Sequence, residues 1–573
     1  MGDAQSKKVA LIPCFLIFVG AVALYARTIG FAALSWDDPQ NIFANPYLQA
    51  GSWAELANVW QQPYFGLYIP LTYSAWGMWL KLVALVAPSY LVQSLHLLNV
   101  VIHAINGVLF CLLLLRYRVP RYLSLVVALL FVCHPIQAGT VSWISGFRDL
   151  FGASLGLAAL NVAHESRSTK QMLTAALLFW LSILAKPSIV TLPLVAVVMD
   201  RRCLRLAAVT LIGALPCLWL SQSQAVDFAF DWVAPLWFRL PVALDTLTFY
   251  GYKLFLPLSF GADYGRSPES LFLSRQWLWT WVPPVVFVML MLYRGSLGVL
   301  RGTLVVVVIL LPVLGLMPFL HQNFSTPADH YAYLSFIGFG VMLIPRDGKS
   351  QVVNSRPQVY PWFWRGAPFL LLSVLSVLSV LLVLTVREQA YWASNETFYR
   401  HMVAINPRSF NGQVNLAAAL IAADPTSIAA EQSLRAALVL EAGHTLPLYY
   451  LSRLYLLESQ PKKVLELVQP WEALGPKHST RFLPSASDNQ LFWSYIEVNS
   501  AIAAKRLGDL SRCDARLQRA LAYGPRNAVV HYQIGLRWRE LGRNDKALEE
   551  MTTAAALDPQ TDAYQQAPGV SRL

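Results

Sequence analysis

Two adjacent carboxylates follow the first apolar segment of the chain, in the sequence Ser35-Trp36-Asp37-Asp38-Pro39. Neighbouring carboxylates repel each other when both are ionised, which raises the pKa of one and suits it to act as a general base. An Asp before a Pro also opens many turns, so a structural role for the pair is the alternative. The residue types alone leave both interpretations of Asp37 and Asp38 open.

Cationic residues occur at the ends of later apolar segments. Arg148 and Asp149 begin one of them, where the Arg is either neutralised by a structural ion pair or presents its planar guanidinium to a phosphate. Lys186 lies between two apolar segments with no acidic neighbour in sequence, so it either snorkels to the membrane surface or binds an anion. His330 begins a late segment, where a buried, hydrogen-bonded histidine is the alternative to a functional one.

Four residues are predicted to support these groups: His134, Asp149, Asp329 and Tyr331. Together the set suits a reaction on an anionic substrate held in a membrane. The sequence has no Ser-His-Asp arrangement, no HExxH and no phosphate-binding loop, so the energy for a transfer must come from the substrate itself. The six cysteines include no CxxC or zinc spacing, and no metal site is predicted, although a divalent metal is compatible with the candidate residues.

The elements that position these residues are predicted to be membrane helices. The chain of 573 residues is 56% hydrophobic and only 13% charged, with a mean hydropathy of +0.46, whereas soluble proteins carry about 25% charged residues. Residues 1–386 hold 24 Lys and Arg against 14 Asp and Glu, and residues 387–573 hold 20 against 18. The positive excess lies in short loops between apolar segments, which argues against a nucleic-acid partner.

Eleven apolar segments are predicted to cross the membrane, the first of them an uncleaved helix after Lys7 and Lys8. They are residues 9–26, 91–115, 121–135, 148–163, 171–186, 188–199, 204–221, 277–293, 301–318, 330–345 and 367–386. Pro, Gly and charged residues interrupt two further segments, 69–88 and 237–258, which are predicted to lie on the membrane surface.

The distribution of positive charge orients these spans. Of the 24 Lys and Arg in residues 1–386, 16 fall in the segments assigned to the inside. Those segments are 1–8, 116–121, 164–170, 200–205, 294–301 and 346–366. By the positive-inside rule the loop 27–90, the candidate residues and the C-terminal part 387–573 then lie outside.

The C-terminal part is predicted to be a soluble array of helix pairs. Ala520-Leu521-Ala522-Tyr523-Gly524-Pro525 and Ala555-Ala556-Leu557-Asp558-Pro559 end matching units 34 residues apart. Small and large apolar residues between them allow two antiparallel helices to pack and to stack on the next pair. The period resembles that of tetratricopeptide repeats, which bind segments of other proteins.

With these motifs in order, the chain resembles the transmembrane-and-tetratricopeptide O-mannosyltransferases and their bacterial relatives, members of the GT-C glycosyltransferase superfamily. The likeness rests on the following residues: Trp36-Asp37-Asp38, Pro70-Leu71-Thr72, His96-Leu97-Leu98-Asn99, His103-Ala104-Ile105-Asn106, His134-Pro135, Trp143-Ile144-Ser145-Gly146, Lys186-Pro187 and Asp329-His330-Tyr331-Ala332-Tyr333-Leu334.

The resemblance implies a GT-C domain over 1–386 and a catalytic acidic residue, Asp37 or Asp38, in the first outer loop. It implies a polyprenyl-phosphate sugar as donor, whose phosphate Arg148, Lys186 and His330 would contact. Relatives usually carry a Glu where this chain has Gly139, and an Arg where it has Phe147. Because these departures surround the donor pocket, the resemblance does not fix the sugar, with mannose and arabinose as examples.

The sequence therefore predicts an all-α chain with a polytopic membrane domain and a repeat domain in the periplasm of a bacterial inner membrane. Its expected activity is transfer of a sugar to Ser or Thr of an exported protein, such as a pilin, captured by the repeats. A glycan or lipid acceptor would suit the same membrane domain. A non-catalytic assembly factor with a degenerate GT-C half is the alternative from another class, and a transporter of lipid-linked sugars is disfavoured because no internal symmetry is visible.

Overall fold

The computed structural model describes residues 2–49, 53–164, 168–223, 232–345, 361–472, 475, 486–524, 526–559 and 561. These residues form helices and connecting turns and include no β-strand, with one isolated bridge between Tyr64 and Leu67. The prediction of an all-helical chain is confirmed. The chain forms two compact units, residues 1–405 and 406–573.

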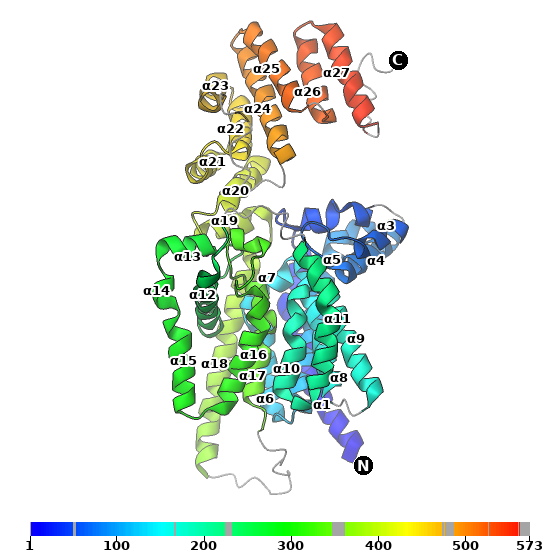
Figure 1. Ribbon diagram of the computed structural model, residues 1–573, viewed down its shortest axis with the longest axis vertical. Helices are drawn as coiled ribbons and strands as arrows, with labels where there is room; N and C mark the ends of the chain where they lie inside the picture. The colour runs from blue at the N-terminus through cyan, green and yellow to red at the C-terminus, as the bar shows by residue number, and fades with distance from the viewer. Residues whose placement is uncertain are drawn as a thin grey trace. The chain divides into compact units, whose positions relative to one another are not determined.

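The first unit extends beyond the boundary at residue 386 suggested by the sequence, because its last long helix continues to Tyr391 and the next helix packs against the same unit. Its α-helices (Figure 1) are α1 (Gly2–Tyr25), α2 (Pro46–Gln49), α3 (Trp53–Ala57), α4 (Pro70–Val86), α5 (Leu91–Arg116), α6 (Arg121–Cys133), α7 (Ile136–Ser142), α8 (Phe147–Ala163), α9 (Thr169–Ala185), α10 (Leu192–Met199), α11 (Leu204–Ser223), α12 (Leu236–Phe255), α13 (Pro268–Ser274), α14 (Trp277–Thr280), α15 (Val282–Tyr293), α16 (Leu297–Leu310), α17 (Phe336–Met342), α18 (Pro361–Tyr391) and α19 (Asn395–Ile405).

Among the described residues, four helices are long and apolar enough to cross a membrane: Leu11–Gly30, Pro88–Arg116, Arg201–Ser221 and Leu371–Tyr391. Two bent pairs raise the number to six if each is one span: α6 with α7, bent by 63°, and Pro268–Ser274 with Trp277–Tyr293, bent by 96°. Segments within the predicted spans 171–186, 188–199 and 301–318 form shorter apolar helices, Thr169–Ala185, Pro187–Met199 and Leu297–Val313, where Pro187 and Pro312 end or interrupt the regular α-helix. The structure thus supports a smaller set of full-length spans than the eleven predicted.

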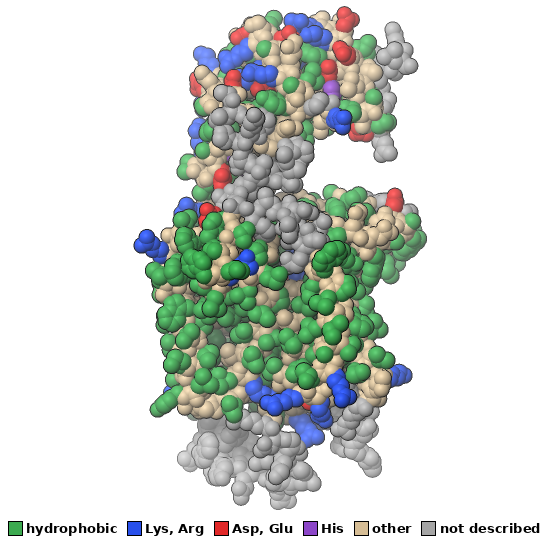
Figure 2. All heavy atoms as spheres, viewed as in Figure 1, with side chains coloured by type: hydrophobic (Ala, Val, Ile, Leu, Met, Phe, Trp, Pro, Cys, Tyr) green, Lys and Arg blue, Asp and Glu red, His purple; other side chains and the backbone are tan. Residues whose placement is uncertain are grey.

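Positive charge gathers at one end of these helices. Figure 2 shows hydrophobic side chains covering the middle of the first unit and Lys and Arg side chains below them, at the end where the N-terminus lies in Figure 1. Exposed basic residues occupy the connections between α5 and α6, between α8 and α9, between α10 and α11, and between α15 and α16: Arg116, Arg118, Lys170, Arg201, Arg202 and Arg294. The predicted inner segment 346–366 lies outside the described residues over 346–360.

Helix α5 carries one buried polar face that fixes two later segments. Asn99 Nδ2 donates to the carbonyl of Trp143 at 2.7 Å, which holds the corner between α7 and α8. His103 Nδ1 and Asn106 Nδ2 lie 2.8 Å and 3.0 Å from the hydroxyl of Tyr333, which belongs to the 3-10 segment η10 (Asp329–Ser335). Since buried polar groups need partners in an apolar bundle, these bonds set the register of both segments against α5.

Two glycines of α8 allow a close approach of the segment that follows α9. A Cβ atom at Gly152 would lie 2.7 Å from Ile189 Cδ1, and one at Gly156 would lie 2.4 Å from Leu192 Cδ1. Ile189 belongs to the 3-10 segment η6 (Pro187–Thr191), which directly follows Lys186. The small residues therefore bring the end of α9 against the beginning of α8.

The second unit consists of helix pairs. Its helices are α20 (Phe410–Ala423), α21 (Ile428–Leu440), α22 (Thr445–Leu457), α23 (Pro461–Val468), α24 (Ala486–Arg506), α25 (Leu510–Tyr523), α26 (Ala528–Glu540) and α27 (Asn544–Leu557). Consecutive helices pack as pairs, and the pairs stack through α22, α24 and α26. The 34-residue period falls on the ends of α25 and α27, and Gly535 lets α26 approach Met551 of α27. Pro525 of the first repeated motif lies outside the described residues.

Candidate functional site

The two carboxylates of the first loop occupy different environments. Asp38 is fully buried, and its side chain accepts hydrogen bonds from Leu34 N at 2.9 Å, Ser145 N at 3.0 Å and Ser145 Oγ at 2.6 Å. Burial raises the pKa of Asp38 to about 6, and these hydrogen bonds oppose the rise. Asp38 therefore joins the first loop to the corner before α8.

Asp37 points to an open cavity and pairs with Arg148. Its side chain keeps 26% of its surface exposed, and its Oδ2 accepts from Arg148 Nη2 at 3.2 Å. The guanidinium of Arg148 also lies over the ring of Trp143, 4.9 Å from its centroid. A carboxyl group at a cavity wall, oriented by an Arg, is placed to accept a proton from a bound hydroxyl.

Lys186 has an acidic partner that the sequence does not reveal. Its Nζ lies 3.0 Å from Asp149 Oδ1, and Arg148 Nε lies 3.7 Å from Asp149 Oδ2. Lys186 has no acidic neighbour in sequence, but it has one in space, because the close packing of α8 and α9 brings residues 149 and 186 together. Asp37, Arg148, Asp149 and Lys186 thus alternate in charge along one buried row.

The segment η10 contributes three more of the predicted residues. Asp329 accepts from the Tyr264 hydroxyl at 2.7 Å and from Gly261 N at 3.1 Å. Burial raises the pKa of Asp329 to about 7, opposed by the charge of Lys253 and the bond from Tyr264. His330 lies against Trp143, with ring centroids 5.9 Å apart, and the ring of Tyr331 lies 5.7 Å from Lys186 Nζ.

One cavity of about 730 Å³ joins these groups. Of the predicted site residues, the cavity wall contains Asp37, Arg148, Lys186, Asp329, His330 and Tyr331. Asp38, Asp149 and His134 do not line it. His134 instead ends α6, where its Nδ1 accepts from Ile136 N at 3.2 Å and its ring packs on Phe336. The structure therefore shows packing contacts for His134 away from the cavity lining, and its role as a supporting site residue stays a prediction.

The same cavity has a long apolar wall. It is formed by Leu67, Ile69, Val190, Leu218, Leu311, Val313, Leu316, Met317 and Phe319, with neighbouring residues of the same segments. These residues belong to the first loop, to η6, to α11 and to the chain between α16 and η10. A cavity lined by both charged and apolar side chains matches an amphiphilic ligand better than a fully polar one.

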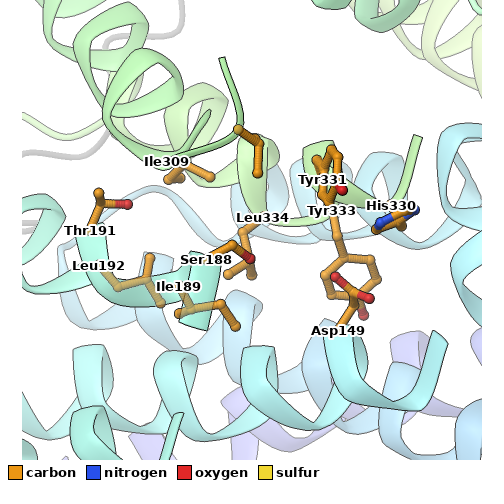
Figure 3. Close-up of a pocket in the computed structure, with 11 residues that line it drawn as sticks. Asp149, Ser188, Ile189, Thr191, Leu192, Ile309, His330, Tyr331, Tyr333 and Leu334 are labelled. Atoms are coloured by element: carbon orange, nitrogen blue, oxygen red, sulfur yellow. The ribbon is translucent and has the colours of Figure 1, made fainter. Parts of the chain in front are cut away.

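A second, much smaller cavity of about 30 Å³ lies beside the first. Figure 3 shows Asp149, His330, Tyr331 and Tyr333 on one side of it and Ile189, Leu192 and Ile309 on the other. It has room for about one water molecule. Asp149 thus faces this small space and not the large cavity.

Several lining residues had no signal in the sequence. Trp392 follows α18 and reaches the cavity beside Gly139, and His321 comes from a short 3-10 turn, Leu320–Asn323. Neither belongs to a motif, since each reaches the site only through long-range packing. Among the described residues, no group of three or more His, Cys, Asp or Glu side chains is arranged to hold a metal ion.

A scan of protein-family models and a search of curated proteins both gave no match to the chain. This site is therefore defined by its geometry alone.

Proposed function

We propose that the chain is an integral membrane glycosyltransferase of the GT-C type. It transfers a sugar from a polyprenyl-phosphate donor to a Ser or Thr hydroxyl of an exported protein. The site faces the outer side of a bacterial inner membrane, and the helix pairs of 406–573 hold the acceptor protein.

The observation that carries the proposal is the cavity itself. Its lining includes the charged side chains of Asp37, Arg148 and Lys186, which ion pairs through Asp149 hold together, and apolar side chains such as Leu311 and Leu316. A polyprenyl-phosphate sugar has the same division between a polar head and a hydrocarbon chain. The basic residues at the opposite end of the helices support an outward-facing site by the positive-inside rule.

The chemistry assigns different roles to the residues. The acceptor oxygen attacks the anomeric carbon of the donor sugar while Asp37 takes the hydroxyl proton. The bond from the anomeric carbon to the phosphate oxygen breaks, and polyprenyl phosphate leaves with the bonding electrons. Arg148 and Lys186 stabilise the negative charge of the departing phosphate. Asp37 is the base in this proposal because it faces the cavity, whereas Asp38 is buried by its bonds to Leu34 and Ser145.

One observation favours the assembly factor as a second candidate. At Gly139, where the resembling enzymes carry an acidic residue, the side chain of Trp392 fills the space: a Cβ atom there would lie 2.6 Å from Trp392 Cζ2. Loss of an acidic group is what a degenerate site would show. The cavity-lining, Arg-paired Asp37 argues for retained chemistry.

The test compares intact masses of exported proteins from cells that express the wild type or Asp37→Asn at equal membrane levels. Asp200→Asn serves as the matched control, because Asp200 pairs with Arg202 in a connection remote from the cavity lining. Loss of mass in steps of one sugar with Asp37→Asn alone supports the proposal and identifies acceptor and sugar. Unchanged masses, with a deletion defect that Asp37→Asn rescues, would establish the assembly factor.

A further inference from the structure

Helix α19 holds the residue that lies two positions before Asp37. Asn395, the first residue of α19, accepts hydrogen bonds through Oδ1 from Ser35 N at 2.7 Å and from Ser35 Oγ at 3.0 Å. The hydroxyl of Tyr399 lies 3.0 Å from the same Ser35 Oγ. Because the Ser35 hydroxyl already donates to Asn395, the Tyr399 hydroxyl is the donor of this third bond. Three bonds therefore fasten one residue of the first loop to α19.

The residue after Asp37 is fastened to a different element. Asp38 accepts hydrogen bonds from Ser145 N and Ser145 Oγ, at the corner before α8. Asp37 thus lies close to two anchored positions of the backbone, with Ser35 bonded to α19 on one side and Asp38 bonded to the corner on the other. A carboxylate between two such anchors has few available directions, and Asp37 takes the one that pairs it with Arg148.

The helix that supplies the first anchor is itself held in place. Its beginning is capped reciprocally, because Ser394 N donates to Thr397 Oγ1 at 3.1 Å and Thr397 N donates to Ser394 Oγ at 3.3 Å. Further along α19, His401 Nε2 donates to the Phe260 carbonyl oxygen at 2.7 Å, and Tyr399 is fully buried. A support that is locked by its own cap and packing transmits its position to the group that it holds.

We propose that Asn395 and Tyr399 are positioning residues for Asp37. Neither lines the cavity, so both act through Ser35, which keeps the Asp37 carboxylate directed at the cavity and at Arg148. The inference rests on the proposed function, in which Asp37 is the base, and it extends the machinery of that reaction to a helix outside the cavity wall.

The exposure of Ser35 separates this role from a contribution to stability. Because Ser35 is exposed, water replaces Asn395 as its partner when the amide side chain is removed. No buried donor at Ser35 is then left without a partner, so the free energy of unfolding changes little. The loop loses its anchor, however, and Asp37 populates directions in which it does not meet the acceptor hydroxyl. Misplacement of a reacting group by about 1 Å can lower a rate by about 10².

The experiment separates the orientation of the base from the binding of the donor. Full-length protein in lipid nanodiscs is given undecaprenyl phosphate that carries mannose, arabinose or glucose, with the periplasmic extract of a deletion strain as acceptor. We expect Asn395→Leu to lower the transfer rate at saturating donor by about tenfold and to leave the KM for the donor within a factor of about two. Asn395→Asp keeps an acceptor oxygen for Ser35 and should restore the wild-type rate. Tyr399→Phe removes one of the three bonds and should lower the rate by about threefold.

The amide of Ser35 gives a second readout that does not depend on transfer. Its hydrogen exchange should be about tenfold faster in Asn395→Leu than in wild type and should stay slow in Asn395→Asp. The amide of Ser145, which donates to Asp38, should exchange at the wild-type rate in both variants. Arg400→Gln is the matched control, because Arg400 is exposed on the same helix and pairs with Glu396.

Thermal unfolding identifies any variant that fails to fold, and Tyr399→Phe, which keeps the buried ring, decides the result if Asn395→Leu does not fold. A wild-type rate in the folded variants would overturn the positioning role while the transferase stands, even if the Ser35 amide exchanges faster. A raised KM at an unchanged rate, or no recovery with Asn395→Asp, would overturn it as well. Absence of transfer by wild type with all three donors would overturn the proposed function and the positioning role together.

Discussion

Arg148 donates through Nη2 to Asp37 Oδ2 at 3.2 Å, although 111 residues separate the two along the chain. Arg148 begins α8, and Asp37 lies in the first loop, so this ion pair forms only when the loop docks on the helix bundle. Asp38, one position later, turns the other way and binds Ser145. Replacing Asp37 and replacing Asp38 should consequently have different effects.

Replacing Asp37 should remove activity and leave the fold intact. We expect Asp37→Asn to lower kcat by ~10²–10⁴, the usual contribution of a general base, with an unchanged melting temperature. Asp38→Ala should instead lower stability by about 1–3 kcal/mol for each donor left unpaired at Leu34 and Ser145. Transfer assays and thermal unfolding of purified protein check both. A large drop in melting temperature for Asp37→Asn would contradict these roles.

Stability should depend on pH through Asp38. Burial raises the pKa of Asp38 to about 6, above its ordinary value of 3.8, so the folded protein holds this proton more tightly than the unfolded chain. The resulting contribution, on the order of 3 kcal/mol, is present in full below about pH 4 and is lost as pH rises through about 6. Melting temperatures of wild type should therefore fall across this window relative to Asp38→Asn, which carries no titrating group there. Asp37→Asn is the control: it removes only the smallest contribution to the raised pKa of Asp38, the charge of Asp37, and should retain most of the wild-type slope. Parallel curves for wild type and Asp38→Asn would refute the prediction.

The Asp149–Lys186 pair should contribute both to stability and to phosphate binding, and substitutions should separate the two contributions. Lys186→Met removes the closer partner of the buried Asp149 carboxylate and leaves it only the 3.7 Å contact with Arg148 Nε, which should cost up to about 3–5 kcal/mol. Adding Asp149→Leu should recover most of that stability, since both charges are then gone. If Lys186 also contacts the donor phosphate, the double variant should regain its melting temperature without regaining transfer. Recovery of both would show that Lys186 acts only as the partner of Asp149.

Gly139 and Trp392 should be energetically coupled. Gly139→Ala places a Cβ atom 2.6 Å from Trp392 Cζ2, so we expect a loss of about 1–3 kcal/mol from overpacking. Trp392→Leu makes room for the methyl group, and the combined loss should be smaller than the sum of the single losses. Melting temperatures of the four proteins in this cycle measure the coupling. Additive losses would mean that the two side chains do not share the space.

In the second unit, Gly535→Val should separate α26 from α27. A Cβ atom at this position would lie 2.9 Å from Met551 Cγ and 3.1 Å from the Ala547 carbonyl oxygen. We expect a local loss of about 1–3 kcal/mol and faster proteolysis between α25 and the C-terminus of the full-length protein. Arg539→Ala, an exposed position on α26, is the control. Equal cleavage of the two variants would exclude close packing at Gly535.

The sequence by itself determined the helical class, the positions of most helices and the residues that could do chemistry. Apolar runs interrupted by Pro, Gly and short basic loops have few alternatives to helices, because a backbone in an apolar environment must satisfy its own hydrogen bonds. Asp37, Arg148, Lys186 and His330 could be selected from the sequence because charged and titratable residues are rare beside apolar segments.

The tertiary structure alone decided where those side chains lie and what they contact. The residue types do not distinguish Asp37 from Asp38. The two differ because the first loop docks so that Asp38 accepts a hydrogen bond from Ser145. Lys186 lies beside its partner Asp149 because α8 packs on α9. Trp392 lies against Gly139 although it belongs to a turn more than two hundred residues later in the chain. Ion pairs and cavity walls depend on distances between segments remote in sequence, and local patterns of residues carry no information about such distances.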